Sequence, residues 1–236
     1  AKTLRGPSTF SDGFDGAALD QEAWVVIQGN DLRTAKVDLV DRADPATRRL
    51  RIAADSIGTD DRTVKSLGVR SARAWGFGEP GRRVSVKMDW NDQANGAYLT
   101  FAVYLCPTAT DGNPEDEPTW LKWEYVGVPQ DNLVRAVVAR RREGRREWLE
   151  RYGWPAERRG REVGEHRIDV FMDGTSVAIR EEGRERYRWK DHDLGFGEAF
   201  VYLVMTTHSN YFERSVFFDD FATAPEAVPG KASGTP

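Results

Sequence analysis

The chain has 236 residues, of which 39% are hydrophobic, so it can bury a substantial core within one large domain. Eight Trp, eleven Phe and seven Tyr against three Met favour a sheet protein over a helix bundle. The net charge of -4 gives no reason to expect nucleic acid as a partner, no apolar run approaches the roughly 18 residues that span a bilayer, and the single cysteine excludes an internal disulfide.

Composition divides the chain into three parts. Residues 1–9 read as a lead-in segment, residues 10–224 as one domain, and residues 225–236, rich in Pro, Ala, Gly, Ser and Thr, as a flexible tail or linker. Such a tail often joins a second module, so we expect a monomer or one module of a longer chain. A first residue other than Met fits a removed signal peptide, and we expect a secreted or extracytoplasmic protein.

Frequent turn signals cut the domain into short strands. Asn-Gly at 95–96 and Asp-Gly at 111–112 and 173–174 separate alternating apolar runs, as in an antiparallel sandwich or barrel. The predicted strands are 49–53, 83–89, 97–105, 120–126, 133–140, 166–172, 176–181, 199–206 and 215–221. Residues 140–152 fit either a helix or a hairpin that turns at Glu143-Gly144, and we favour the hairpin.

The segment 120–127, WLKWEYVG, places one carboxylate among three large aromatic residues. On a strand, Trp120, Lys122 and Glu124 share one face while Trp123 and Tyr125 share the other. Aromatic rings suit the C–H face of a pyranose, and a carboxylate beside them can act as acid, base or hydrogen-bond acceptor. The alternative is a half-buried strand with one hydrogen-bonded glutamate.

Several motifs resemble those of the concanavalin A-like lectin/glucanase superfamily, whose fold is a two-sheet jelly roll. Segment 10–16, FSDGFDG, opens the domain and segment 217–221, FFDDF, closes it, as in that superfamily. Residues 64–71 resemble the region where family 16 glycoside hydrolases enter the concave sheet, and residues 166–177 resemble a recurring Asp-Gly hairpin. The resemblance implies an all-β, antiparallel β-sandwich that acts on carbohydrate.

The resemblance places the segment around Glu124 at the catalytic strand of those hydrolases, a Glu-x-Asp-x-Glu or Glu-x-Asp-x-x-Glu pattern. Glu124 matches the last glutamate, the acid/base, but the nucleophile position falls on Trp120 or Thr119 and the helper aspartate on Lys122 or Leu121. A retaining glycosidase needs two carboxyl groups roughly 5 Å apart. A second must therefore come from elsewhere, and no spacing selects among the nearest acids, which are Asp89, Asp92, Glu115, Glu117 and Glu213.

Two further segments carry polar chemistry. The superfamily includes polysaccharide lyases, and residues 207–214 hold the histidine, tyrosine and arginine that elimination on a uronate needs, His208, Tyr211 and Arg214. Residues 135–167 hold eleven arginines and six glutamates, so they suit an acidic glycan, with Trp148 and Trp154 as stacking rings. The alternatives are a solvated turn in the first segment and a hairpin laced with ion pairs in the second.

No cofactor is required by these patterns. A structural calcium ion is the one metal that the sequence allows, with Asp12 and Asp219 as ligands if the two ends of the domain pair as strands; the alternative is that each aspartate caps its own turn. We therefore predict a protein that cleaves glycosidic bonds in a polysaccharide or oligosaccharide. The alternatives are a carbohydrate-binding module without catalysis and a polysaccharide lyase. Glycan binding would then use Trp120, Lys122, Trp123, Tyr125, Trp148 and Trp154.

Overall fold

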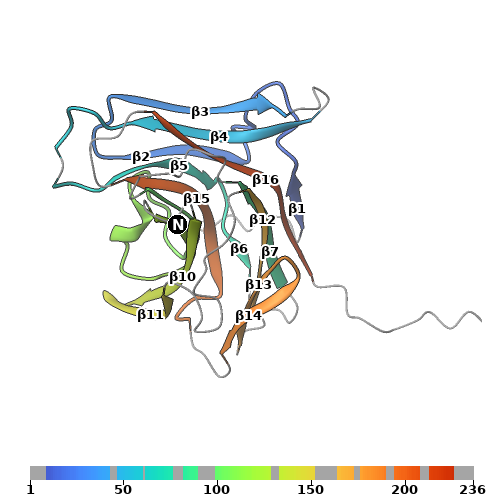
Figure 1. The fold of residues 1–236 in the computed structure, drawn as a ribbon. Helices are drawn as coiled ribbons and strands as arrows, with labels where there is room; N and C mark the ends of the chain where they lie inside the picture. Colours follow the sequence, from blue (N-terminus) through green and yellow to red (C-terminus); the bar gives the residue numbers. More distant parts are fainter. Residues whose placement is uncertain are drawn as a thin grey trace, which may run out of the picture.

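A computed structural model of the chain describes residues 9–42, 47–60, 62–76, 82–89, 99–128, 133–151, 164–172, 176–189, 194–207 and 213–225. Two eight-stranded sheets pack face to face as an antiparallel β-sandwich (Figure 1). This confirms the predicted all-β jelly roll. In the part of the chain that is described, no helix is long and apolar enough to cross a bilayer.

We call one layer the back sheet. Seven of its strands follow one another in the order β14, β13, β12, β7, β16, β4, β3, and β1 pairs with β16. Their bounds are β1 Phe10–Asp12, β3 Thr34–Asp41, β4 Arg48–Asp55, β7 Arg82–Asp89, β12 Glu165–Met172, β13 Val177–Glu181, β14 Arg184–Trp189 and β16 Arg214–Pro225. The pairing of β1 with β16 brings the two ends of the domain together, as the resemblance implied.

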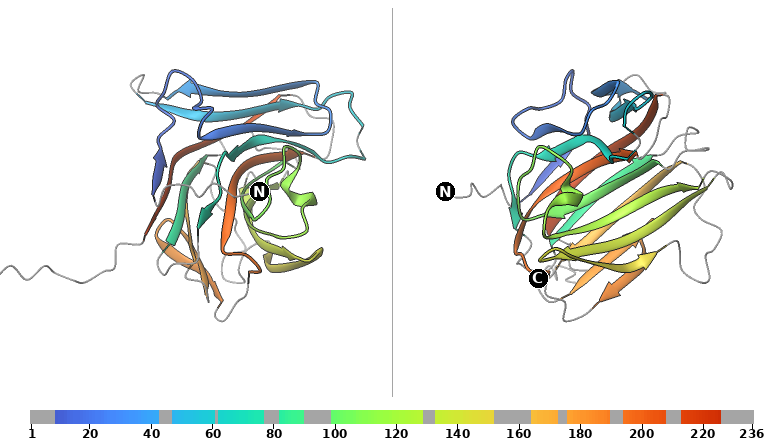
Figure 2. Two further views of the ribbon diagram at one scale, coloured as in Figure 1. Left: turned by 180° about the vertical axis from the view of Figure 1, so that it is seen from behind. Right: turned by 90° about the vertical axis from the view of Figure 1, so that its left-hand side faces the viewer.

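The other layer is the front sheet, in the order β11, β10, β9, β8, β15, β5, β2, with β6 on β15. Its strands are β2 Trp24–Gly29, β5 Lys65–Ser71, β6 Trp75–Gly76, β8 Leu99–Cys106, β9 Trp120–Val128, β10 Leu133–Arg142, β11 Arg145–Arg151 and β15 Glu198–Thr207. The sheet curls so that its outer face is concave, and the segment between β8 and β9, with its short helix η2 (Pro114–Asp116), lies in the curl (Figures 1 and 2).

Nine predicted strands correspond to strands of the structure, and the favoured hairpin over 140–152 is confirmed as β10–β11. Glu143 and Gly144 form its turn with φ of 48° and 81°, a conformation in which glycine has no steric penalty. The strand predictions omitted β1, β2, β3, β5, β6 and β14. Most of these are short or carry charges on their outer face, which weakens the two-residue pattern of apolar side chains.

The main core lies between the sheets, where alternate side chains of every long strand meet. A second, smaller apolar cluster lies on the opposite, concave face of the front sheet, and it includes Ala102, Tyr104, Trp120, Tyr202 and Val204. Those side chains are buried although they point away from the main core. Something must therefore cover the concave face, and that cover builds the candidate site.

Candidate functional site

Strand β9 divides its side chains between the two clusters. Leu121, Trp123 and Tyr125 belong to the main core, where the Tyr125 hydroxyl donates a 2.5 Å hydrogen bond to Glu181 of the back sheet. The prediction that Trp123 and Tyr125 stack on a sugar is therefore wrong, because both rings are 1% exposed or less. Their size and apolar character instead bind the two sheets together.

The opposite face of β9 carries Trp120, Lys122 and Glu124, as the alternation predicted. Trp120 was also expected to stack on a sugar, but its ring is fully buried in the concave-face cluster, edge-to-face with Tyr104 at 5.8 Å. It packs beneath the segment that covers this face, and its indole N–H donates to the Glu115 carbonyl at 3.3 Å. Trp120 therefore supports the site from below and offers no face to a ligand.

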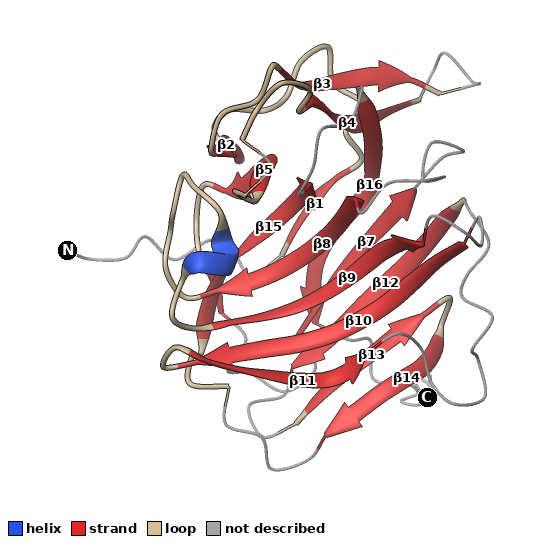
Figure 3. Ribbon diagram, turned by 60° about the vertical axis from the view of Figure 1, so that its left-hand side comes forward, coloured by secondary structure: helices blue, strands red, loops and turns tan. Residues whose placement is uncertain are grey.

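The cover is the segment 107–119, which we call the β8–β9 loop. It crosses β15, where the Tyr202 hydroxyl donates to the Thr108 carbonyl and accepts from the Thr110 N–H. It then reaches the edge strand β2, where the Gln28 N–H donates to the Asp111 carbonyl at 3.0 Å. It returns to β9 through η2 (Figure 3). The loop thus spans the concave face of most of the front sheet.

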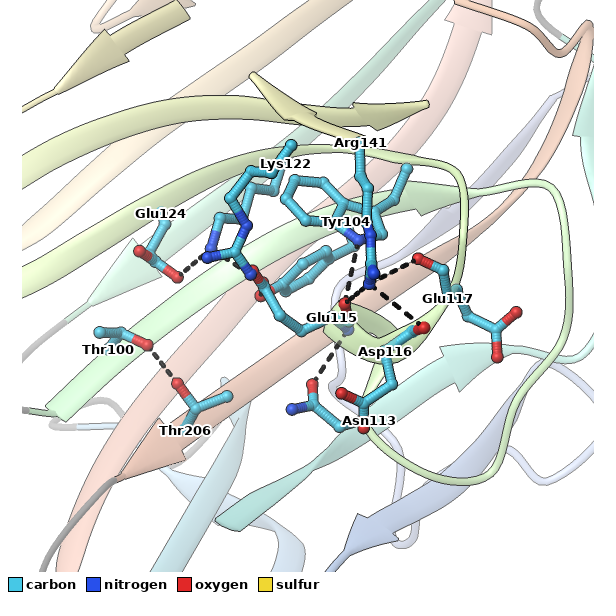
Figure 4. Close-up of polar contacts among 12 residues, drawn as sticks. Thr100, Tyr104, Asn113, Glu115, Asp116, Glu117, Lys122, Glu124, Arg141 and Thr206 are labelled. Carbon is cyan, nitrogen blue, oxygen red and sulfur yellow. Dashed lines mark hydrogen bonds and ion pairs between the residues drawn. The ribbon is translucent and has the colours of Figure 1, made fainter. Parts of the chain in front are cut away.

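Close packing and capping hold the loop in place. A Cβ atom on Gly29 would lie 2.5 Å from the Ser66 hydroxyl and 3.0 Å from the backbone nitrogen of Asn113, so glycine is needed where the loop meets β2. The Asn113 side chain caps η2 by accepting from the Glu115 N–H at 3.1 Å. One guanidinium nitrogen of Arg141 donates to three carbonyls at the end of η2, those of residues 115, 116 and 117. Figure 4 shows the contacts of Asn113 and Arg141 with η2.

This fixed loop brings Glu115 to the β9 carboxylate. The Lys122 ammonium lies 2.9 Å from Glu115 Oε2 and 2.8 Å from Glu124 Oε2 (Figure 4). Because both oxygens contact the same nitrogen, they are at most the sum of those distances apart, about 5.7 Å. Glu115 is one of the five acids that the sequence offered as a second carboxyl group. Asp92 lies outside the described residues, and of the other four Glu115 is the one that shares Lys122 with Glu124.

Lys122 is almost completely buried, with a side chain only 4% exposed. Besides the two carboxylates, the rings of Tyr104, Trp120 and Trp148 lie around its ammonium with centroids 5.4 to 5.8 Å away. Negative charge and aromatic faces both stabilise a cation that has lost its water. A sugar can therefore contact Lys122, as predicted, only through the part of the ammonium group that the two carboxylates leave open.

The electrostatics favour a charged Glu115. Burial raises the pKa of this carboxyl group, but the Lys122 ammonium, the hydrogen bond from Tyr104 (2.6 Å) and Arg146 outweigh it, so the pKa lies below its usual range. Burial and the neighbouring Glu115 and Glu124 carboxylates hold the pKa of the Tyr104 phenol well above its ordinary value. Tyr104 therefore serves as a hydrogen-bond donor and not as a base near neutral pH.

These groups line a pocket of about 330 Å³ on the concave face. Its floor carries the hydroxyls of Thr100 and Thr206, which are hydrogen-bonded to each other, beside Glu124. Trp148 of β11 forms part of its wall and is 42% exposed, and the Arg146 guanidinium lies 5.3 Å from its ring centroid. Of the aromatic residues predicted to stack on a sugar, Trp148 is the one whose described position allows it.

The remaining predicted site residues do not join this pocket in the described structure. Arg214 begins β16 of the back sheet and does not line the pocket. Its expected partners His208 and Tyr211, and the stacking residue Trp154, lie outside the described residues. The arginines of the β10–β11 hairpin that are described largely serve the protein itself: Arg140 pairs with Glu147, Arg141 caps η2, and Arg146 pairs with Glu115.

The two aspartates expected to bind calcium have other partners. Asp12 accepts hydrogen bonds from the Phe14 N–H at 2.7 Å and from the Trp24 indole at 2.8 Å. Asp219 lies 3.0 Å from the Arg42 guanidinium and accepts from the Asp220 N–H. Among the described residues, no three His, Cys, Asp or Glu side chains are grouped so that they could hold a metal ion. The described residues therefore do not fit a calcium site.

Sequence reasoning missed Tyr104, Asn113, Arg146 and the Thr100–Thr206 pair as site residues. Tyr104, Thr100 and Thr206 lie two residues apart from other concave-face positions, so their faces could have been assigned once the strand registers were known. Asn113 and Arg146 carry no such signal, because a loop and a separate hairpin bring them in. The registers come from long-range pairing that a local pattern does not contain.

The arrangement departs from the family 16 pattern that the sequence resembles. In that pattern three acids lie at alternate positions of one strand, whereas here the concave face of β9 presents Trp120, Lys122 and Glu124 in turn. Trp120 is buried and Lys122 carries the opposite charge to an aspartate. The carboxyl pair is instead formed by one strand residue and one loop residue, with an ammonium between them.

No model of a known protein family matches the sequence, and no curated protein matches it. Solved structures match over nearly their whole length. A β-1,3-glucanase from Mycobacterium marinum has a TM-score of 0.59 at 15% identity and covers 92% of this chain and 99% of its own. The family 16 (GH16) protein of the Bacteroides ovatus mixed-linkage glucan locus has a TM-score of 0.64 at 10% identity, with 90% and 98% covered.

The catalytic module LamA from Zobellia galactanivorans gives a TM-score of 0.62 at 11% identity, covering 91% of this chain and 96% of its own. These identities are too low to carry an activity from one protein to another, and they show the fold alone. The chain therefore has the concanavalin A-like jelly-roll fold of the family 16 glycoside hydrolases.

Proposed function

We propose that this protein binds a neutral carbohydrate in the pocket lined by Glu115, Glu124 and Trp148. One observation carries the proposal: Trp148, an aromatic residue that is 42% exposed, lines a pocket together with hydrogen-bonding side chains from β8, β9, β15 and the β8–β9 loop. A pyranose presents an apolar C–H face to a ring and a rim of hydroxyls to acceptors and donors, so it matches both features.

The charges of the pocket support a neutral sugar. Glu115 and Glu124 face Lys122 and Arg146, so the positive charges that line the pocket are already paired with negative ones. A uronate carboxylate would meet two carboxylates of the same sign, and every cation among the described residues that line the pocket is already paired. This argues against the lyase alternative at this pocket. The relatives with this fold include a protein named for β-1,3-glucan and one named for mixed-linkage glucan, which makes neutral β-glucans the first ligands to test.

Cleavage of a glycosidic bond is the second candidate, because two carboxyl groups lie near each other in one pocket. Their oxygens are at most about 5.7 Å apart, a bound that admits the roughly 5–5.5 Å of retaining glycosidases. Against it stands Lys122. One carboxyl group of such an enzyme must act as an acid, whereas an ammonium ion in contact with a carboxyl group favours its ionised form. We therefore rank binding above hydrolysis, and the prediction of cleavage stays a prediction.

The test is a binding and product screen. Laminarin, mixed-linkage β-glucan, their tetrasaccharides and an oligouronate are titrated by calorimetry, while reducing ends and unsaturated products are followed in parallel. We expect the neutral glucans to bind without new reducing ends, and Trp148→Ala to weaken binding by about tenfold through loss of stacking.

Matched variants separate the two candidates. Glu124→Gln should alter glycan affinity, whereas Glu147→Gln on the exposed side of the same hairpin should not, because Glu147 pairs with Arg140 outside the pocket. New reducing ends that vanish in both Glu115→Gln and Glu124→Gln would favour hydrolysis over binding alone. Failure of every neutral glycan to bind would refute the proposed function.

A further inference from the structure

We infer that the pocket recognises the end of a glycan chain and not its interior. This inference rests on the proposed function, and it names which part of a glycan the site accepts. The observation behind it is that the β8–β9 loop fills the concave face that an open groove across the front sheet would use.

A glycan that lies across the front sheet would have to pass over β8, β15, β5 and β2 in turn. The side chains on that path are covered: Tyr104 and Ala102 of β8, Tyr202 and Val204 of β15 and Ile27 of β2 are all 1% exposed or less. Because the loop makes hydrogen bonds to β15 and to β2, it seals the path on both sides of β5.

Hydrogen bonds and buried aromatic rings hold the loop on the sheet. Arg70 of β5 pairs with Asp111 at 2.8 Å, and the Tyr202 hydroxyl makes two hydrogen bonds to loop backbone. Beneath the loop lie fully buried aromatic rings that would be exposed if it opened. The inner pocket therefore ends at the loop, and a sugar that enters it has reached the end of its path in that direction.

A second cavity joins the inner pocket and can hold the rest of the glycan. This cavity, of about 540 Å³, lies over η2 and shares Val64, Asn113, Glu115 and Arg146 with the inner pocket. Its lining also includes Thr63 and Asn30, together with Arg141 and Gly144 of the β10–β11 hairpin. The inner pocket, about 330 Å³, is near the lower limit of the roughly 300–1,000 Å³ of small-molecule sites. A terminal sugar fits inside, and the following sugars lie in the outer cavity.

Glu115 stands where the two cavities join, so the bond between the terminal sugar and the next one would pass beside it. This gives the Lys122-bridged carboxyl pair a defined place on the ligand. Glu124 faces the terminal sugar alone, since it lines the inner pocket and not the outer cavity, whereas Glu115 faces both sugars.

The stoichiometry of binding tests the inference. Laminarin fractions of increasing length and laminaritetraose are titrated by calorimetry and by sedimentation, and the number of protein molecules bound per glycan chain is measured. Recognition of one kind of end predicts one protein per unbranched chain at every length. A number that grows in proportion to chain length would overturn the inference while leaving glycan binding intact. Absence of binding to every fraction would remove the proposed function together with the inference.

A pair of rim variants tests the path. Thr63→Trp, which fills the outer cavity, should weaken laminaritetraose binding by about tenfold and leave methyl β-glucoside binding within about twofold. The neighbouring residue Arg62 is exposed and lines neither cavity, so Arg62→Trp is the matched control and should change neither. Equal weakening of both ligands by Thr63→Trp, or an unchanged tetrasaccharide affinity, would overturn the proposed path.

Discussion

The two outer faces of this sandwich both carry ion pairs, but they use them differently. On the back sheet, Arg51 meets Asp38 and Lys36 meets Glu213 at the surface, where water screens the charges. On the front sheet, the β8–β9 loop closes over Lys122 and its two glutamates, so the same kind of contact is buried. The comparison teaches that a covering loop, more than the choice of charged residues, turns a surface ion pair into a site.

The largest loss in the free energy of unfolding is expected for a substitution of Lys122. Lys122→Met removes the cation between two buried carboxylates and should lower the free energy of unfolding by about 3–5 kcal/mol, because an uncompensated buried charge is left behind. Urea unfolding at pH 7 measures this. Part of the loss should be recovered in the combined variant with Glu115→Gln and Glu124→Gln. A loss below about 1 kcal/mol for the single change would mean that water reaches these carboxylates.

The next largest loss of stability is expected where the β8–β9 loop packs against β2. Gly29→Ala places a methyl group 2.5 Å from the Ser66 hydroxyl, and overpacking of this kind destabilises a protein by about 1–3 kcal/mol. Gly76→Ala is the control, since a Cβ there would meet nothing within 4 Å. Thermal unfolding of the two variants should differ clearly. Equal melting temperatures would contradict the close packing of loop and sheet.

A pH effect belongs to the back sheet. Burial, together with the nearby acids Asp220 and Glu165, raises the pKa of Asp219 to about 6 against the pull of Arg42. A carboxyl group with a raised folded-state pKa stabilises the fold when protonated, so its contribution is present below about pH 4 and is lost as pH rises through 6. Relative to Asp219→Asn, the wild-type free energy of unfolding should gain about 1 kcal/mol from pH 7 to pH 5. A pH-independent difference would refute the raised pKa.

The smallest effect is expected at the exposed pair of the back sheet. Lys36 and Glu213 are 3.4 Å apart with side chains 51% and 46% exposed. Lys36→Met should therefore change the free energy of unfolding by no more than about 0.5 kcal/mol. Lys122→Met is the matching substitution on the front sheet. Similar losses at the two lysines would remove the distinction between the two faces.

Much of the fold was predictable because it rests on local patterns. Turn signals and alternating apolar residues located nine strands, the hairpin of residues 140–152 and the face of β9 that carries Glu124. The site was only half predictable. Glu124 could be named from its strand, whereas Glu115 could be placed beside it only by the path of the loop, which depends on Tyr202, Asp111 and Gly29 at distant positions.

The predictions of sugar-stacking residues were wrong for a related physical reason. Trp120, Trp123 and Tyr125 have the composition of a sugar platform, but composition does not reveal which side of a strand is covered. In this protein both sides of β9 are covered, one by the back sheet and the other by the loop. Trp148 lies on the edge strand β11 and is 42% exposed.

The alternation along β9 also protects the site against error in strand pairing. A shift of β9 by one residue against β8 and β10 would turn Lys122 and Glu124 into the space between the sheets and carry Trp123 and Tyr125 to the concave face. Such a register would bury two charges in the main core and lose the contact between Tyr125 and Glu181. The register that packs the core is thus also the register that positions the carboxyl pair, and selection for a stable fold would preserve the geometry of the pocket at no separate expense.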